Sequence, residues 1–353
     1  MDKEKAINFI ENSFIRELLK NDGVTDISYN GSQIFYLHNQ YGRRKARIKI
    51  DEEEAKDFIR QIANLCEKQF SYQTPKLDVS VGRYRINAVH QSIARRNNES
   101  CLNFSIRIAG NQPIITKDSN FLNAELISLF DVLLLSHMSI AIGGCTGSGK
   151  TEFQKYLISV LPEFTRLIVI DNVLELDNLN IDYLDINIWQ ADEKSKESNI
   201  QELVRNALRS NPDWLIVAES RGKEMIEVLN SAMTGHPIIT TLHALDAESM
   251  PKRIARMIMM NEQRQDYEMV MEDIYYNFRF YVYLKRKINS DGKVIRYIEE
   301  VAEIDEKGVK NTIYYYKDGV TKLSYIREKT LKNLDYQNNP TFMKAFTKEV
   351  YKE

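Results

Sequence analysis

Residues 144–151 read Gly-Cys-Thr-Gly-Ser-Gly-Lys-Thr, a composition that suits the binding of phosphate groups. Glycines let successive backbone N–H groups approach phosphate oxygens, and the ammonium group of Lys150 can reach a β- or γ-phosphate. The hydroxyl of Thr151 can bind Mg²⁺, and the helix expected from this residue points its positive end at the anion. We therefore predict a P-loop that binds ATP and Mg²⁺. The predicted contact residues are Gly144, Cys145, Thr146, Gly147, Ser148, Gly149, Lys150, Thr151 and Glu152.

Hydrolysis of a bound nucleotide also needs a carboxylate near the γ-phosphate, and the chain offers acids at two strand ends. The apolar run "WLIVA" is followed by Glu219, and "RLIVID" ends in Asp171, with Glu175 four residues on. Ligands of parallel sheets bind at the carboxyl edge, where these acids are expected. A further strand pattern, "PIITTL", lies between His236 and His243. This order of features favours a hydrolase over a protein that only binds the nucleotide.

The elements that must position these residues alternate between strand and helix after residue 120. Short, continuous apolar strands between helices predict a parallel sheet covered on both faces. The segments "FRFYVYLKRK" and "VIRYIEEVAEI", joined by a turn at "NSDGK", predict an antiparallel extension, and residues 311–326 predict one more hairpin. No structure is predicted for the last 25 residues.

The first 110 residues predict a smaller α+β domain. Strands are expected over "VTDISYN", "IFYLHN", "ARIKI" at 46–50, "YRINAVH" and "LNFSIRIA". A helix is expected from Asp51, which could cap it, with Glu54 in the first turn. Residues 109–120 gather Gly, Pro, Asn, Asp and Ser, so we expect a linker at 111–120 and domains that span 1–110 and 121–353.

Composition narrows the class of protein. The net charge of −2 and the pI near 6.3 give no global basic field, so stable binding to nucleic acid is not expected. The three cysteines, Cys66, Cys101 and Cys145, fit neither a disulfide framework nor a paired-cysteine zinc site, which indicates a reducing, cytoplasmic setting. The acidic N-terminus is not typical of a signal peptide. The most apolar window, 124–144, is interrupted by Glu125, Asp131 and His137, so no transmembrane segment is expected.

Four motifs together resemble the secretion ATPase superfamily, which powers type II and type IV secretion, pilus assembly and retraction, and conjugation. "GCTGSGKT" corresponds to its Walker A loop, "IDNVLEL" to its aspartate box, "PDWLIVAESRG" to its Walker B strand and "TGHPIITTLHA" to its histidine box. "TDISYNG", "PKLDVSVGRYRI" and "SIRI" resemble its N-terminal domain, and "IRYIEEVAEI" resembles its C-terminal R-x-I-x-E-V segment. The resemblance covers residues 20 to about 304 and is closest to the short branch with one N-terminal domain.

This resemblance implies a RecA-like P-loop ATPase domain and a set of catalytic residues. Glu219 would act on the attacking water or on Mg²⁺, which it would bind with Thr151, partly through water. Glu175 would assist, and Arg85 and Arg107 of the N-terminal domain would contact phosphates as two domains close. The implied catalytic set is Glu219, Glu175, Lys150, His243, Arg85 and Arg107. Arg209, Arg221 and Glu224 also match family positions, and we interpret them as interface or structural residues.

The family implies a cytoplasmic homohexamer at the inner face of the cell membrane that works with membrane-embedded secretion or pilus proteins. One departure is the start of the aspartate box, Asp171-Asn172 in place of Glu-Asp, which leaves the roles of Asp171, Asn172 and Glu175 open. A nucleotide-gated adaptor with little turnover, suggested by Asn172, and a DNA translocase, suggested by basic runs such as "GRRKARIK", stay open as alternatives. The sequence names neither the machine nor its cargo.

Overall fold

The computed structural model describes residues 2–110, 114–119, 121–177, 179, 181–193, 195–261 and 265–348. The chain divides into two compact units. Unit 1 comprises Met1–Asn111 with Lys287–Ile295, and unit 2 comprises Gln112–Arg286 with Arg296–Glu353.

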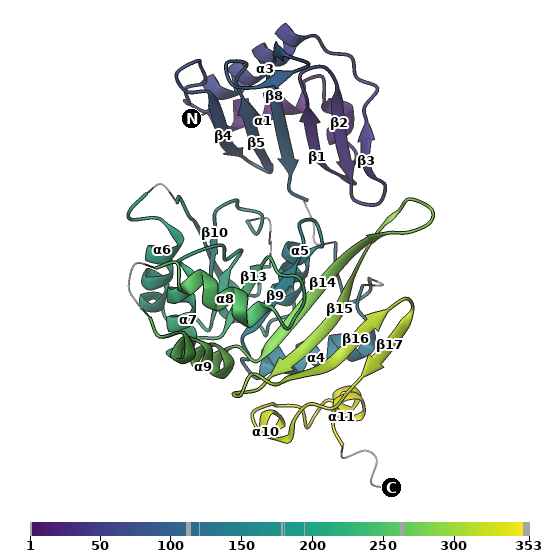
Figure 1. Ribbon diagram of the computed structural model, residues 1–353, viewed down its shortest axis with the longest axis vertical. Helices are drawn as coiled ribbons and strands as arrows, with labels where there is room; N and C mark the ends of the chain where they lie inside the picture. The colour runs from purple at the N-terminus through teal and green to yellow at the C-terminus, as the bar shows by residue number, and fades with distance from the viewer. Residues whose placement is uncertain are drawn as a thin grey trace. The chain divides into compact units, whose positions relative to one another are not determined.

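Unit 1 contains a six-stranded sheet of order β3-β2-β1-β8-β5-β4 within the described ranges, with antiparallel neighbours (Figure 1). The strands are β1 (Val24–Tyr29), β2 (Ile34–His38), β3 (Gly42–Lys45), β4 (Lys76–Val81), β5 (Tyr84–Val89) and β8 (Asn103–Ile108), with a separate short pair β6 (Arg95–Arg96) and β7 (Glu99–Ser100). The helices are α1 (Lys3–Glu11), α2 (Arg16–Leu19) and α3 (Glu52–Leu65). Apolar side chains of α1, α3 and the sheet form one core.

The helix predicted from Asp51 is confirmed as α3, because the Asp51 carboxylate accepts a hydrogen bond from the backbone N–H of Glu54 at 2.8 Å. The strand predicted at 46–50 is wrong. The pairing strand is β3, the charged stretch just before it, and its last bond joins the N–H of Ala46 to the carbonyl of Ile34. Because Ile34 is the first residue of β2, the chain beyond Ala46 has no partner left, and Ile48 and Ile50 pack on the core without pairing.

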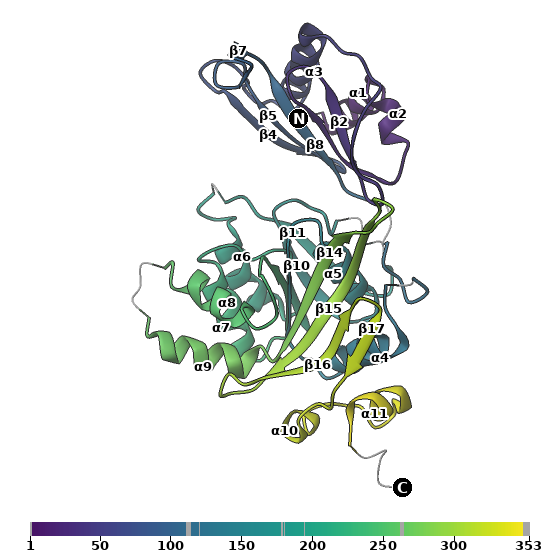
Figure 2. The ribbon, with the colours of Figure 1, turned by 45° about the vertical axis from the view of Figure 1, so that its right-hand side comes forward.

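Unit 2 is built on a sheet of nine strands, counted over the part of the chain that is described, in the order β11-β10-β12-β13-β9-β14-β15-β16-β17 (Figures 1 and 2). Neighbours from β11 to β14 are parallel, and β15 to β17 are antiparallel to one another, which confirms the predicted α/β core with an antiparallel extension. The strands are β9 (Ile140–Gly144), β10 (Arg166–Asp171), β11 (Asp185–Gln190), β12 (Trp214–Val217), β13 (Ile238–Leu242), β14 (Phe280–Ile288), β15 (Val294–Ile304), β16 (Lys310–Lys317) and β17 (Val320–Leu323).

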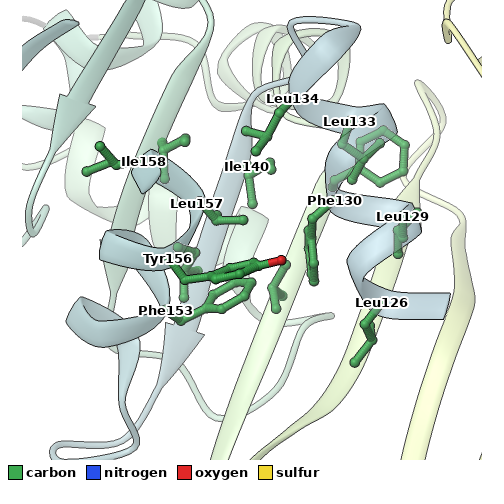
Figure 3. Close-up of a cluster of buried hydrophobic side chains, with 14 of the residues drawn as sticks. Leu126, Leu129, Phe130, Leu133, Leu134, Ile140, Phe153, Tyr156, Leu157 and Ile158 are labelled. Carbon is green, nitrogen blue, oxygen red and sulfur yellow. The ribbon is translucent and has the colours of Figure 1, made fainter. Parts of the chain in front are cut away.

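Helices cover both faces of this sheet. They are α4 (Ala124–Leu135), α5 (Lys150–Ser159), α6 (Ile200–Ala207), α7 (Met225–Met233), α8 (Met250–Ile258), α9 (Tyr267–Asn277), α10 (Glu328–Leu331) and α11 (Pro340–Phe346), with a 3₁₀ turn at Leu208–Ser210. One core joins α4 and α5 to the sheet, and Phe130, Phe153 and Leu157 meet there (Figure 3). A second core joins the other face to α6 through α9.

The C-terminal tail, for which no structure was predicted, packs on α4. Asn339 caps α11 and accepts a hydrogen bond from Ser128 of α4 at 2.8 Å, and Phe342 and Phe346 are buried. In the described ranges, no helix combines the length and the apolar composition needed to cross a membrane.

Candidate functional site

The loop after β9 has the backbone geometry of a phosphate cradle. Gly144, Gly147 and Gly149 have φ angles of 153°, 74° and 98°, a region that other residues rarely adopt. At Gly144 a Cβ would lie 2.5 Å from Ser148 Oγ and 2.6 Å from the carbonyl of Leu284, so a side chain does not fit there. Gly149 then starts α5, and the helix leaves the loop with its N-terminus at the predicted phosphate position.

Lys150 is buried, and its ammonium group donates hydrogen bonds to the carbonyls of Gly144 at 3.0 Å and Cys145 at 3.2 Å. The ammonium group of Lys150 therefore lies against the backbone of the loop. A phosphate oxygen could accept the hydrogen bonds that these carbonyls accept here. Thr151 is in the first turn of α5, half-buried. Glu152 accepts a hydrogen bond from the N–H of Ile114 at 3.1 Å and pairs with buried Lys155 at 3.0 Å, so its carboxylate has structural partners.

Glu219 lies two residues beyond β12 at the carboxyl edge of the sheet, with its two oxygens in different surroundings. Oε2 accepts a hydrogen bond from Arg221 Nη2 at 2.6 Å, and Oε1 lies 3.0 Å from His243 Nε2. The His243 contact lacks hydrogen-bond geometry, and Oε1 is buried with no hydrogen-bond donor among the described residues. A buried carboxylate oxygen without a donor is a position that a water or a cation can fill.

Charges around Glu219 keep it ionised. Burial raises the pKa of its carboxyl, but the hydrogen bond and charge of Arg221, with His243 and Lys150, outweigh burial and hold the pKa below its ordinary value. Lys150 is thus close enough to act electrostatically on Glu219, which brings the loop and the Walker B acid to one site. Arg221, interpreted from the sequence as an interface or structural residue, is part of this site.

The two acids of the aspartate box, Asp171 and Glu175, lie in different surroundings. Asp171 ends β10 and is buried, and its oxygens accept hydrogen bonds from the N–H groups of Val173 at 2.8 Å and Leu176 at 3.1 Å. The carboxylate of Asp171 therefore holds the turn, whose Leu174 has a φ of 58°. Glu175 is half-buried. The hydrogen bond and charge of Glu219 raise the pKa of Arg221, and the charge of Glu175 adds to this effect, so Glu175 is near the Glu219–Arg221 pair.

The two histidines lie at opposite ends of β13. His243 follows the last residue of the strand and contacts Glu219, whereas His236 precedes the first and hydrogen-bonds Thr234 at 3.1 Å. Glu224, interpreted as structural, accepts bonds from the N–H groups of Arg221 and Gly222 and so holds the turn after Glu219. Arg209 lies exposed in the 3₁₀ turn after α6.

In unit 1, Arg85 of β5 and Arg107 of β8 are directly opposite each other in the antiparallel ladder. Arg85 pairs with Asp78 at 3.4 Å. Arg107 is also directly opposite Asp26 of β1. The two arginines are cross-strand neighbours on one face of the sheet, so one anion could contact both.

ATP and Mg²⁺ fit the residues of unit 2. The glycine cradle and Lys150 match a polyphosphate, and the unpartnered Glu219 Oε1 matches a metal-bound water. Over the described ranges, no group of three or more His, Cys, Asp or Glu side chains is arranged to hold a metal ion. Mg²⁺ commonly takes one or two protein ligands and completes its shell with phosphates and waters, as Thr151 and Glu219 would allow.

Arg286 and Arg296 of the β14–β15 hairpin also flank the loop, and sequence reasoning missed both as site residues. Arg296 Nε donates a hydrogen bond to the carbonyl of Gly147 at 2.7 Å. Arg296 begins the R-x-I-x-E-V segment, which was the one available signal; Arg286 had none. Only the sheet order, with β14 next to β9, brings Arg286 to the site.

Comparisons with known proteins agree with this geometry. A family model described as "Type II/IV secretion system protein" matches residues 83–274. An uncharacterised protein of Bacillus anthracis is 30% identical over 87% of this chain and 73% of its own length. A putative conjugal transfer protein of Mycobacterium tuberculosis is 23% identical, covering 68% of this chain and 71% of its own. The solved structure of the Legionella pneumophila ATPase DotB has the same fold, with a TM-score of 0.63, 20% identity and coverage of 83% of this chain and 80% of its own.

Proposed function

The chain belongs to the type II/IV secretion system protein family and is an ATPase of that family, and we propose that it works as a Mg²⁺-dependent homohexameric motor. Its machine would be a secretion, conjugation or pilus assembly. The conjugal transfer relative favours work of this kind. We place the motor in the cytoplasm at the inner face of the membrane, with membrane-embedded platform proteins as partners.

The observation that carries the proposal is the position of Glu219, which shares one edge of the sheet with the phosphate-binding loop. Its carboxylate is held ionised by Arg221, and its other oxygen is buried next to His243 without accepting a hydrogen bond from any described residue. An ionised carboxylate with a free lone pair can orient a water molecule or take its proton. A protein that only senses nucleotide has no need of this group.

The residues of the site then have the following tasks. The backbone N–H groups of the loop and the ammonium of Lys150 bind the phosphate chain and stabilise charge that develops on it. Thr151 and Glu219 would hold Mg²⁺, partly through water, and the ion when bound supplies charge neutralisation at the β- and γ-phosphates. Glu219 orients the attacking water, His243 keeps Glu219 in place, and Glu175 acts beside Arg221.

Arg85 and Arg107 are proposed as a second pair of phosphate contacts, supplied by unit 1. Guanidinium groups bind phosphate oxygens through two parallel hydrogen bonds, and these cross-strand neighbours present two such groups side by side on one face of the sheet. Contacts that exist only with nucleotide bound make conformation depend on nucleotide, which is how hydrolysis can drive movement.

The mass of the particle tests the assembly. We expect light scattering behind size exclusion to give a six-chain particle with MgATP, and a smaller particle for Lys150→Ala, which cannot bind the phosphates. Nucleotide bound to the eluted particle is measured in the same run. A wild-type chain that binds MgATP and stays monomeric would contradict the hexamer.

A further inference from the structure

Arg286 lies at the edge of the sheet that holds the phosphate-binding loop. β14 pairs parallel with β9, and Leu284 is opposite Gly144, the last residue of β9. The strand continues past that point to Ile288, so Arg286 stands beside the loop, where the carboxyl edge of a parallel sheet binds ligands.

Alternation along the strands places two arginines on the face that α5 covers. Phe280, Val282 and Leu284 of β14 belong to the core shared with α4 and α5, and Arg286 continues this row. On β15, Ile298 belongs to the same core, and Arg296 lies two residues before it. Lys285 and Glu299 alternate to the opposite face, where they pair at 2.6 Å.

Both arginines lie next to the glycines of the loop. Arg296 donates to the carbonyl of Gly147 at 2.7 Å, and its Cδ lies 3.5 Å from the position of a Cβ at Gly149. Arg286 Nη1 lies 3.8 Å from the position of a Cβ at Gly147. The pair therefore lines one side of the loop, next to the start of α5.

Positive charges gather around Arg286. Across the described ranges Arg286 forms no ion pair, and its Nε is buried with no hydrogen-bond partner. Burial lowers the pKa of Arg296, and the nearby charge of Arg286 lowers it further. Lys150 and the positive end of α5 add to the same region. A buried guanidinium nitrogen without an acceptor costs free energy, which a bound polyanion would offset.

We propose that Arg286 donates hydrogen bonds to phosphate oxygens of the nucleotide held in the loop, and that Arg296 is a positioning residue that holds the loop through Gly147. The proposal rests on the proposed function and deepens its site. It adds Arg286 and Arg296 of the β14–β15 hairpin to the site, in addition to the proposed phosphate contacts of Arg85 and Arg107.

Binding to the 353-residue chain tests Arg286. We expect Arg286→Gln to weaken both MgATP and inorganic tripolyphosphate about tenfold, the loss typical of one charge-assisted hydrogen bond. Arg286→Lys should recover part of the loss, because it keeps the charge and loses the fork. Lys322→Gln makes the same change of charge at an exposed position of β17 and should bind both ligands as wild type does.

Hydrogen exchange in nucleotide-free protein tests Arg296. Arg296→Gln should speed exchange of the amides at 144–151, whereas Arg286→Gln should not. Unchanged exchange in Arg296→Gln would overturn its positioning role.

The binding results distinguish a failure of this proposal from a failure of the proposed function. Wild-type affinity of Arg286→Gln for both ligands would overturn the phosphate contact, and a loss for MgATP alone would assign Arg286 to the base or ribose instead. A wild-type chain that does not bind MgATP would overturn the proposed function itself.

Discussion

At the scale of single residues, the ionised state of Glu219 depends on its neighbours. Burial by itself would raise the pKa of this carboxyl, and Arg221 is the principal group that lowers it. The lowered pKa means that the carboxylate stays charged to a lower pH than an ordinary buried glutamate. Activity that needs the carboxylate is therefore present above this pKa and lost as the pH falls through it.

Removing Arg221 should change the pH dependence of the ATPase activity. In Arg221→Gln the burial of Glu219 is no longer opposed by the adjacent charge, so the pKa of Glu219 rises. The acid limb of the pH profile of kcat/KM for MgATP should move to higher pH. A limb at the wild-type position, with activity lowered uniformly, would contradict this electrostatic role. Lys322→Gln removes a distant charge and serves as the control.

Sequence reasoning reached the residues that stand in recognisable motifs. The loop, Glu219 and His243 follow from short patterns whose chemistry is specific, and the structure brings Glu219 and His243 within 3.0 Å. The place of Arg286 in the site could not be predicted from the sequence, because an arginine on a strand is usually solvated and only the sheet order shows that it lies next to the loop. The role of Asp171 was also out of reach, because a strand-end acid looks the same whether it binds backbone or substrate.

At the scale of elements, the turn after β10 depends on one buried carboxylate. Asp171 satisfies two backbone N–H groups, and Leu174 between them takes a left-handed conformation. This turn carries Glu175 toward Arg221. The aspartate box therefore positions its second acid by means of its first.

Replacing Asp171 by alanine should destabilise unit 2 by about 2 kcal/mol, since two backbone N–H groups, one buried and one part-buried, lose their acceptor. The two tryptophans of the chain, Trp189 in β11 and Trp214 in β12, make fluorescence a probe of unit 2 during urea unfolding. Asp177→Ala, an exposed acid in the same segment, should change the free energy of unfolding by less than about 0.5 kcal/mol. Equal stability of both variants would contradict the structural role of Asp171.

Buried parallel strands were predictable and edge elements were not. The strands β9, β10, β12 and β13 are continuous apolar runs, whereas β11 is an edge strand with half-buried residues and gave no clear pattern. The predicted strand at 46–50 was wrong because pairing depends on the length of the partner β2, which the local sequence does not contain.

At the scale of the whole molecule, one sheet edge collects groups from four strands. The loop follows β9, the aspartate box follows β10, Glu219 follows β12 and His243 follows β13. These strands are neighbours or near neighbours in one parallel sheet, so residues more than 90 positions apart in the sequence meet at one site. We propose that ATP is hydrolysed at this edge and that Glu219 activates the attacking water.

Steady-state phosphate release tests this claim most directly. With ATP and Mg²⁺, we predict turnover by wild type, and a rate at least about 100-fold lower for Glu219→Gln, the size typical of a lost general base. Glu219→Gln should still bind MgATP, EDTA should abolish turnover, and Lys322→Gln should match wild type. Equal background rates in wild type and Glu219→Gln would contradict the claim and favour a nucleotide-gated adaptor.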